Sequence, residues 1–170
     1  ITKQNMVHSA LATADFFHLE PRNTALHCLP TRYIAGKMML VRAIIIGLEL
    51  DLIAPTSNLE QAIGSKNYDF MAIVPIQIPE NVEILNQVKT ILIGGARLSD
   101  LQRKKLFSVK TAIFETYGMT ETITHIAAKK INDLNFKTLP NVTLITDVRD
   151  CLVIHAPDIC NTLITTNDLV

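Results

Sequence analysis

The chain has 170 residues, with 16 basic and 16 acidic side chains, so its formal net charge is zero. Apolar residues make up 48% and charged residues 19%, which is typical of a globular chain and excludes a disordered one. Zero net charge, no dense Lys/Arg stripe, no Trp and only three Tyr argue against nucleic acid as the main partner.

The cysteines, Cys28, Cys151 and Cys160, are widely spaced and give neither a disulfide framework nor a zinc signature. We interpret them as thiols of a cytoplasmic protein. The most apolar region, 34–54, is interrupted by charged residues, so no membrane span is expected. The chain begins at Ile1 and stops abruptly after an apolar run, and we expect both ends to be cuts through a larger protein.

Short helical and extended patterns alternate along the first two thirds of the chain. In chain order they predict a helix over 3–17, a strand over 25–29, a helix over 34–48, a strand over 50–54, a short helix over 57–63, a strand over 70–74, a short helix over 82–88, a strand over 90–93, a helix over 100–107 capped by Ser99, and a strand over 111–114. This alternation predicts an α/β fold with a mostly parallel, helix-covered sheet.

The pattern changes after Glu121 and contains no further clear helix. An extended stretch is expected over 122–127, and strands are expected over 142–146, 151–155 and 162–166. We therefore expect an α/β core over 1–135, followed by a small β-rich subdomain over 136–170.

The strongest candidate for a binding site is the segment 114–122, FETYGMTET, which follows a predicted strand. Ligands of parallel sheets bind at the carboxyl ends of the strands. Tyr117 offers a ring for stacking, Gly118 a flexible backbone point, Thr120 a hydroxyl donor and Glu121 a carboxylate for Mg²⁺. These groups suit a nucleotide, although a plain turn at a strand end also fits the segment taken alone.

Two further segments are weaker signals on their own. Gly94, Gly95 and Ala96 follow another predicted strand, and paired glycines let a ligand approach the backbone, although they more often just form turns. Asp168, in the segment TTNDL, is able to accept hydrogen bonds from two ribose hydroxyls, although taken alone the segment is an ordinary polar turn.

Together, the order, spacing and strand-end placement of these segments resemble the adenylate-forming superfamily of acyl- and aryl-CoA ligases, adenylation domains and luciferases. The run YGMTE, 117–121, matches its most specific core motif. Residues 166–169 resemble its later threonine-glycine-aspartate-leucine motif, with Asn167 in place of the glycine, which puts the shape of that loop in doubt.

The segment 28–39, CLPTRYIAGKMM, occupies the place of the superfamily's leucine-proline-leucine-phenylalanine-histidine-x-x-glycine motif, with Tyr33 where most members have histidine. This variant, with the THIA extension over 124–127, looks like an o-succinylbenzoate–CoA ligase of menaquinone biosynthesis. The resemblance covers essentially the whole chain and implies ATP, Mg²⁺ and CoA as cofactors, with a small-molecule carboxylate as substrate.

The resemblance also implies roles for individual residues. The nucleotide would be bound by Gly94, Gly95, Ala96, Glu115, Thr116, Tyr117, Gly118, Met119 and Asp168. Among them, Tyr117 would stack on adenine and Asp168 would bind the ribose hydroxyls. Thr120 would contact the α-phosphate and Glu121 would hold Mg²⁺, so these two are the catalytic candidates. Tyr33 and Gly36 would border the acyl pocket.

o-Succinylbenzoate has two carboxylates, and the one that is not activated needs a cation or donors if it is buried. Lys37 and Arg42 interrupt the otherwise apolar helix beside the expected acyl pocket. We predict Lys37 as the partner of this carboxylate, with Arg32 as the second choice; the alternative is a lysine that extends along the helix surface into solvent. His125 is expected either to line the pocket or to have a structural role.

In the implied reaction, a carboxylate attacks the α-phosphate of ATP to give an acyl-adenylate and pyrophosphate, and a thiol then displaces AMP. The superfamily's phosphate-binding loop and C-terminal lobe are not found in this chain, so we expect it to fold without completing adenylation alone. An adenylation domain that loads a carrier protein and a non-catalytic nucleotide- or acyl-binding module are the alternatives. The sequence leaves a homo-oligomer open.

Overall fold

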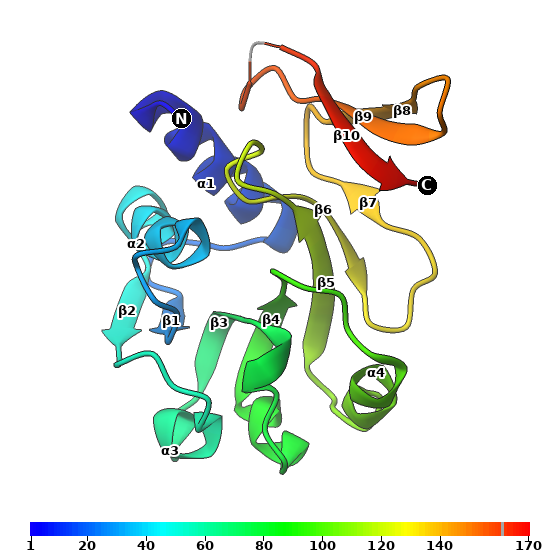
Figure 1. Ribbon diagram of the computed structural model, residues 1–170. Coiled ribbons are helices and arrows are strands. Elements are labelled where there is room, and N and C mark those ends of the chain that lie inside the picture. Colours follow the sequence, from blue (N-terminus) through cyan, green and yellow to red (C-terminus); the bar gives the residue numbers. More distant parts are fainter. Residues whose placement is uncertain (161) are drawn as a thin grey trace.

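The computed structural model describes residues 1–160 and 162–170, and its centre is a seven-stranded sheet in the order β2-β1-β3-β4-β5-β6-β7 (Figure 1). Its strands are β1 (Thr24–His27), β2 (Glu49–Leu52), β3 (Tyr68–Ile73), β4 (Val88–Ile93), β5 (Ala112–Gly118), β6 (His125–Lys130) and β7 (Lys137–Thr138). The first five strands pair in parallel, whereas β6 and β7 are antiparallel to their neighbours. The predicted α/β class with a mostly parallel sheet is confirmed.

Helices cover both faces of this sheet. They are α1 (Lys3–Phe17), α2 (Ile34–Ile46), α3 (Leu59–Ile63) and α4 (Asp100–Leu106), together with the 3₁₀ helices η1 (Pro75–Gln77) and η2 (Val82–Gln87). Because successive strand residues point to opposite faces, Ala25 packs with Phe17 of α1 and Met39 of α2, whereas Leu26 packs with Leu59 of α3. Strands β1, β3, β4 and β5 therefore each contribute to two apolar cores.

Several element boundaries follow local chemistry that the sequence reveals. Ser99 caps α4 as predicted: its hydroxyl accepts from the amide of Gln102, whose side chain accepts from the amide of Ser99. The predicted helix over 82–88 is a 3₁₀ helix that ends one residue earlier, because β4 already begins at Val88.

A second, antiparallel sheet has the order β10-β9-β8 and lies beside β6 and β7 (Figure 1). Its strands are β8 (Thr143–Thr146), β9 (Cys151–His155) and β10 (Ile164–Leu169). Leu152 and Ile154 of β9 pack against Ala10 of α1, Met38 of α2 and Ile126 of β6. The small sheet is thus seated on the same helices that cover the large one.

Two details of the predicted β-rich region differ from the structure. Residues 121–124 form a turn, so the extended stretch predicted over 122–127 begins only at His125. Lys137 and Thr138 pair with β6 at the edge of the large sheet, and the small sheet starts at Thr143. Among the described residues, none of the helices has the length and apolar character needed to cross a membrane.

His27, at the end of β1, is buried at 3% exposure, and neither ring nitrogen has a hydrogen-bond partner among the described residues. Burial holds the pKa of this imidazole below its ordinary value. The unfolded chain therefore takes up a proton that the folded chain resists, so stability falls as the pH drops below about 6.5.

We expect His27→Leu to raise the free energy of unfolding by about 1–2 kcal/mol at neutral pH, because it removes two unpartnered polar atoms from an apolar core. The gain should grow at pH 5.5. Urea unfolding at pH 7.5 and pH 5.5 measures both effects, with the exposed His155→Leu as the matched control. Loss of stability in His27→Leu at both pH values would contradict this account.

Candidate functional site

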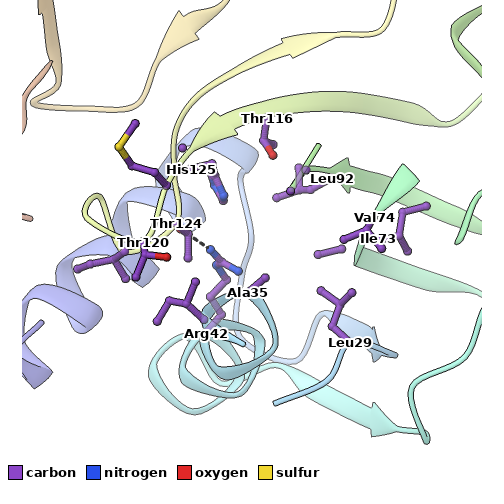
Figure 2. Close-up of a pocket in the computed structure, with 17 residues that line it drawn as sticks. Leu29, Ala35, Arg42, Ile73, Val74, Leu92, Thr116, Thr120, Thr124 and His125 are labelled. Atoms are coloured by element: carbon purple, nitrogen blue, oxygen red, sulfur yellow. Dashed lines mark hydrogen bonds between the residues drawn. The ribbon is translucent and has the colours of Figure 1, made fainter. Parts of the chain in front are cut away.

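A cavity of about 300 Å³ opens at the carboxyl ends of the parallel strands (Figure 2). Strands β3, β4 and β5, together with Leu29 just beyond β1, form one side, and α2 and the loop before β6 form the other. It is lined by Leu29, Ile34, Ala35, Arg42, Ala72, Ile73, Val74, Leu92, Gly94, Gly95, Thr116, Gly118, Met119, Thr120, Ile123, Thr124 and His125. The lining is mostly apolar, and polar groups come mainly from α2 and from residues 116–125.

A second cavity of about 700 Å³ lies on the other side of the end of β5. It is lined by Gly95, Ala96, Arg97, Arg103, Glu115, Thr116, Tyr117, Gly118, Lys129, Phe136 and Asp168. The two cavities share Gly95, Thr116 and Gly118, so they adjoin at this point. Seven of the nine predicted nucleotide-binding residues line the larger cavity, and the other two, Gly94 and Met119, line the smaller one.

Gly118 allows β5 to approach the loop that precedes β6. A Cβ atom at this position would lie 2.1 Å from the carbonyl oxygen of Thr124 and 2.6 Å from the Cα of His125. Both contacts are with backbone, which cannot rotate away. Any side chain at position 118 would push the loop out of the shared wall of the two cavities.

Tyr117 and Asp168, which are 51 positions apart in the sequence, meet across the two sheets. The Tyr117 hydroxyl donates to Oδ2 of Asp168 at 2.5 Å. Burial, and then the Asp168 carboxylate, raise the pKa of Tyr117 well above its ordinary value. Phe136 packs edge-on against the tyrosine ring, with the ring centroids 6.4 Å apart. The aromatic plate and the carboxylate predicted for a nucleoside are thus brought together.

Arg149 helps to hold the part of β10 that carries Asp168. The register of β10 against β9 shifts between Thr165 and Leu169. In this irregular stretch, Arg149 donates to the carbonyl of Thr166 and to the side-chain oxygen of Asn167, each at 3.3 Å. Asn167, which replaces the motif's usual glycine, therefore contributes a hydrogen bond to the loop.

Glu115, one of the residues predicted to bind the nucleotide, has its side chain buried in a charged cluster. Its carboxylate accepts from Arg103 of α4 at 2.8 Å and lies 3.7 Å from Nζ of Lys129, its register partner on β6. Lys129 also lies over the ring of Phe136, 4.8 Å from its centre. Neither cation was predicted from the sequence, because the contact of α4 with β5 and the antiparallel pairing of β5 with β6 carry no local sequence signal.

Arg42 is the main polar residue of the smaller cavity for which the sequence predicts no role. It is 2% exposed, yet no carboxylate among the described residues forms an ion pair with it. Its guanidinium donates to the hydroxyl of Thr124 at 3.0 Å (Figure 2). It also donates to the hydroxyl of Thr13 at 3.3 Å. Burial lowers the pKa of Arg42 to about 10, so it remains a cation at neutral pH.

His125 lines the same cavity, as one of its two predicted roles requires, and lies next to Arg42 (Figure 2). Burial first, and then the charge of Arg42, hold the pKa of His125 well below its ordinary value. Its ring also packs edge-on against Phe17, with the centroids 5.8 Å apart. The imidazole is therefore neutral at physiological pH.

Lys37 lies outside both cavities, on the exposed side of α2. Arg42 is five positions further along the helix, which is a rotation of about 140° around the axis, so only one of the two side chains faces the cavity. Arg32 and Tyr33 are also exposed and line neither cavity; the guanidinium of Arg32 lies 4.9 Å from the Tyr33 ring centre. The assignment to Lys37 assumed that helix position alone places a side chain in the pocket.

Gly36, the other predicted border of the acyl pocket, is buried but lines neither cavity. A Cβ atom there would lie 2.3 Å from the carbonyl oxygen of Pro30. Its absence lets the first turn of α2 pack against the segment that leaves β1. Gly36 therefore sets the position of α2, and thereby that of Arg42.

Thr120 and Glu121 occupy the turn between β5 and β6. Thr120 lines the smaller cavity, whereas Glu121 is exposed and lines neither. Ile123, in the same turn, has a φ of 69°, which is unusual for a β-branched residue. The Thr122 hydroxyl fixes the turn, because it accepts from the amide of Met119 at 2.9 Å and lies 2.7 Å from the carbonyl of Thr124.

Glu121 was also predicted to bind Mg²⁺. Within the part of the chain that the structure describes, no group of three or more His, Cys, Asp or Glu side chains has the arrangement of a metal site. A lone exposed carboxylate fits Mg²⁺, which proteins often hold through one or two carboxylates while substrate phosphates and water complete its coordination.

Two curated proteins are similar to this chain in sequence. The 2-succinylbenzoate–CoA ligase of Staphylococcus epidermidis (strain ATCC 12228 / FDA PCI 1200) is 28% identical over 127 residues, which are 71% of this chain and 27% of the relative. The protein of a second strain, RP62A, is 27% identical over the same length. The chain thus spans little more than a quarter of the length of these curated relatives.

Solved structures resemble this fold over nearly the whole chain. The acyl-CoA synthetase (AMP-forming)/AMP-acid ligase II-like protein of Dyadobacter fermentans is 32% identical with a TM-score of 0.92, over 99% of this chain and 51% of that one. The O-succinylbenzoate coenzyme A synthetase of Bacillus subtilis, in complex with ATP and magnesium ion, has a TM-score of 0.79 over 95% of this chain and 38% of that one. At 18% identity, the latter comparison shows the shared fold alone.

The family described as AMP-binding enzyme matches residues 1–153, which is most of the chain and includes both cavities except Asp168. This match agrees with the superfamily that the YGMTE segment predicts. The chain belongs to the AMP-binding enzyme family.

Proposed function

We propose that the protein containing this chain is an ATP-dependent carboxylate–CoA ligase that acts through an acyl-adenylate, with o-succinylbenzoate as its acid. The observation that carries the proposal is the pair of adjoining cavities at the end of β5. One gathers the residues predicted for a nucleoside. The other is largely apolar and contains a buried cation, Arg42, with which no described carboxylate forms an ion pair.

The larger cavity suits the nucleoside of ATP. The ring of Tyr117 provides a stacking surface, and Gly95 and Ala96 line the same cavity. The carboxylate of Asp168 accepts from Tyr117 through Oδ2, which leaves Oδ1 to accept from ribose hydroxyls. The Arg103–Glu115–Lys129 cluster gives this cavity fixed charges that are already paired with one another.

The reaction would occur where the two cavities meet. A carboxylate oxygen of the acid forms a bond to the α-phosphorus of ATP while the bond to the pyrophosphate oxygen breaks, which gives an acyl-adenylate and pyrophosphate. The thiolate of CoA then bonds to the acyl carbon, and AMP leaves. No general base is needed in the first step, because a carboxylic acid is already ionised near neutral pH.

The protein's part in this chemistry is positioning and charge stabilisation. The Thr120 hydroxyl, beside the shared wall, would donate to an α-phosphate oxygen. Glu121 would hold Mg²⁺, which when bound offsets the negative charge of the phosphate oxygens. The strained turn around Ile123 keeps both side chains next to the end of β5.

The second carboxylate of o-succinylbenzoate would bind Arg42 rather than Lys37. The described residues use two of the five guanidinium N–H groups of Arg42, namely those to Thr13 and Thr124, and provide no anion. A buried cation needs a counter-charge, and a ligand carboxylate in this cavity would supply it. An acid with one carboxylate would leave that charge unpaired.

The test uses the full-length gene product with ATP, Mg²⁺, CoA and a panel of acyl and aryl carboxylates, and it measures AMP release and thioester formation. Preference for o-succinylbenzoate over 3-benzoylpropionate, which lacks the ring carboxylate, would support the proposal. AMP release with a different acid would support the ligase activity but contradict o-succinylbenzoate as the substrate. If no acid in the panel yields AMP, a domain that loads a carrier protein or a non-catalytic binding module becomes the better account.

The 170-residue chain on its own is expected to fold without completing adenylation, and full ATP-dependent ligase activity of this chain would contradict that expectation.

A further inference from the structure

The hydroxyl of Thr13, on α1, is a junction between three polar groups. Thr13 is fully buried, and its oxygen lies 2.8 Å from the carbonyl oxygen of Ser9, 3.3 Å from Nε of Arg42 and 3.4 Å from Nε2 of His125. A threonine hydroxyl has one proton to donate and two lone pairs to accept with. The three neighbours together use this capacity completely.

The assignment of protons follows from the chemistry of the neighbours. The Ser9 carbonyl can only accept, so the single Thr13 proton points to it. Nε of Arg42 can only donate, and it occupies one lone pair. The remaining lone pair faces Nε2 of His125, which must therefore carry a hydrogen. Because His125 is neutral, its other ring nitrogen, Nδ1, is left with a lone pair.

This lone pair is open to the smaller cavity. His125 lines that cavity, and Nδ1 makes no hydrogen bond to any residue that the structure describes. The only side-chain atoms in the described part of the chain that are both fully enclosed and unpartnered belong to His27. Nδ1 of His125 is therefore accessible from the cavity, beside the guanidinium of Arg42 (Figure 2).

We propose that Thr13 is a positioning residue for substrate specificity, which fixes Arg42 as the donor and Nδ1 of His125 as an acceptor in the acyl pocket. This inference rests on the proposed function. A carboxylate cannot donate to Nδ1, so a substrate carboxylate at Arg42 would require a water molecule that donates to both the carboxylate and Nδ1. The pocket then selects an acid with a second, non-reacting carboxylate through the cation of Arg42 and the Nε2-protonated tautomer of His125.

Thr13→Val tests the inference, because it keeps the shape of the side chain and removes the hydroxyl. In the full-length protein we expect the KM for o-succinylbenzoate to rise about tenfold or more, since Arg42 Nε loses its acceptor and the imidazole its constraint. The KM for ATP and the kcat/KM for 3-benzoylpropionate should change less than about twofold. Thr13→Ser, which restores the hydroxyl, should recover the parent KM.

A second measurement needs no substitution. In ¹⁵N spectra of histidine-labelled parent protein at pH 7.5, assigned by comparison with His125→Gln, Nε2 of His125 should be the protonated, pyrrole-type nitrogen and Nδ1 the pyridine-type one. Thr13→Val should change this pattern toward a mixture of tautomers.

Protonation of Nδ1 in the parent would overturn the proposal. Equal losses for the dicarboxylate and the monocarboxylate would also overturn it, because they would indicate a purely structural role. If no acid is activated, the proposed function fails, and the spectra still decide the tautomer.

Discussion

Arg42→Met is expected to raise the KM for o-succinylbenzoate about 100-fold in the full-length protein and to leave the KM for ATP nearly unchanged. The change removes the only unpaired cation that lines the smaller cavity in the described structure. Loss of a buried, charge-assisted contact to a carboxylate costs about 3 kcal/mol, which corresponds to about a 100-fold change. Steady-state AMP release with o-succinylbenzoate and with 3-benzoylpropionate measures the effect, which should be small for the second acid.

The same substitution should stabilise the protein without ligand. A guanidinium buried without an anion is costly to desolvate, and methionine fills a similar volume without that cost. We expect the free energy of unfolding to rise by about 1–2 kcal/mol, as measured by urea titration. Higher stability together with weaker substrate binding is the signature of a residue kept for function at the expense of stability.

Two other substitutions make the Arg42 experiment decisive. Lys37→Met tests the sequence-based prediction that Lys37 binds the second carboxylate. An increase in KM for o-succinylbenzoate as large as that of Arg42→Met would support Lys37 as the partner. Lys110→Met removes an exposed charge just before β5, at the end of the strand away from the cavity, and serves as the matched control. Equal KM values for o-succinylbenzoate in the Arg42→Met variant and the parent protein would rule out Arg42 as the carboxylate partner.

Gly118→Ala should be the most damaging single-methyl change in the site. The new Cβ would lie 2.1 Å from the Thr124 carbonyl oxygen, so either β5 or the loop before β6 must move. Overpacking against backbone costs about 3 kcal/mol, and the displaced wall belongs to both cavities. We expect lower unfolding free energy and higher KM values for both ATP and the acid.

Gly94→Ala provides the comparison for Gly118→Ala. Its Cβ would lie 2.4 Å from Oγ1 of Thr116, which is a side-chain atom and can rotate away. A smaller loss of stability is therefore expected, and urea unfolding of the two variants measures the difference. Equal stability of the Gly118→Ala and Gly94→Ala variants would contradict this prediction, because it would show that the loop before β6 moves at little cost.

The sequence predicts the large sheet well because its strands obey local rules. Each parallel strand is a short apolar run bounded by turn residues, and α4 begins at a serine with glutamine three residues later. Such signals depend on neighbours in the chain, so they can be read without the fold. Seven of the residues predicted to bind a nucleotide line one cavity for the same reason, because motif residues at strand ends converge in any parallel sheet.

The features that the sequence did not predict have a different physical origin. Whether Lys37 or Arg42 faces the cavity depends on which face of α2 packs on the sheet, and an almost uniformly apolar helix gives little information about its orientation. The partners of Glu115 come from α4 and from β6, and the antiparallel return of β6 cannot be derived from a turn that contains no glycine. Buried polar contacts of this kind are set by tertiary packing.

The bond between Tyr117 and Asp168 joins a strand of the large sheet to a strand of the small one. Any ligand that contacts both side chains spans the boundary between the sheets and acts as a tie between them. By thermodynamic reciprocity, a change that destabilises the packing of the small sheet lowers the affinity for the ligand. Binding of the ligand in turn stabilises this packing by the same factor. Leu152 and Ile154 line neither cavity, yet substitutions in their apolar contact with α1 and β6 would therefore appear as changes in nucleotide affinity.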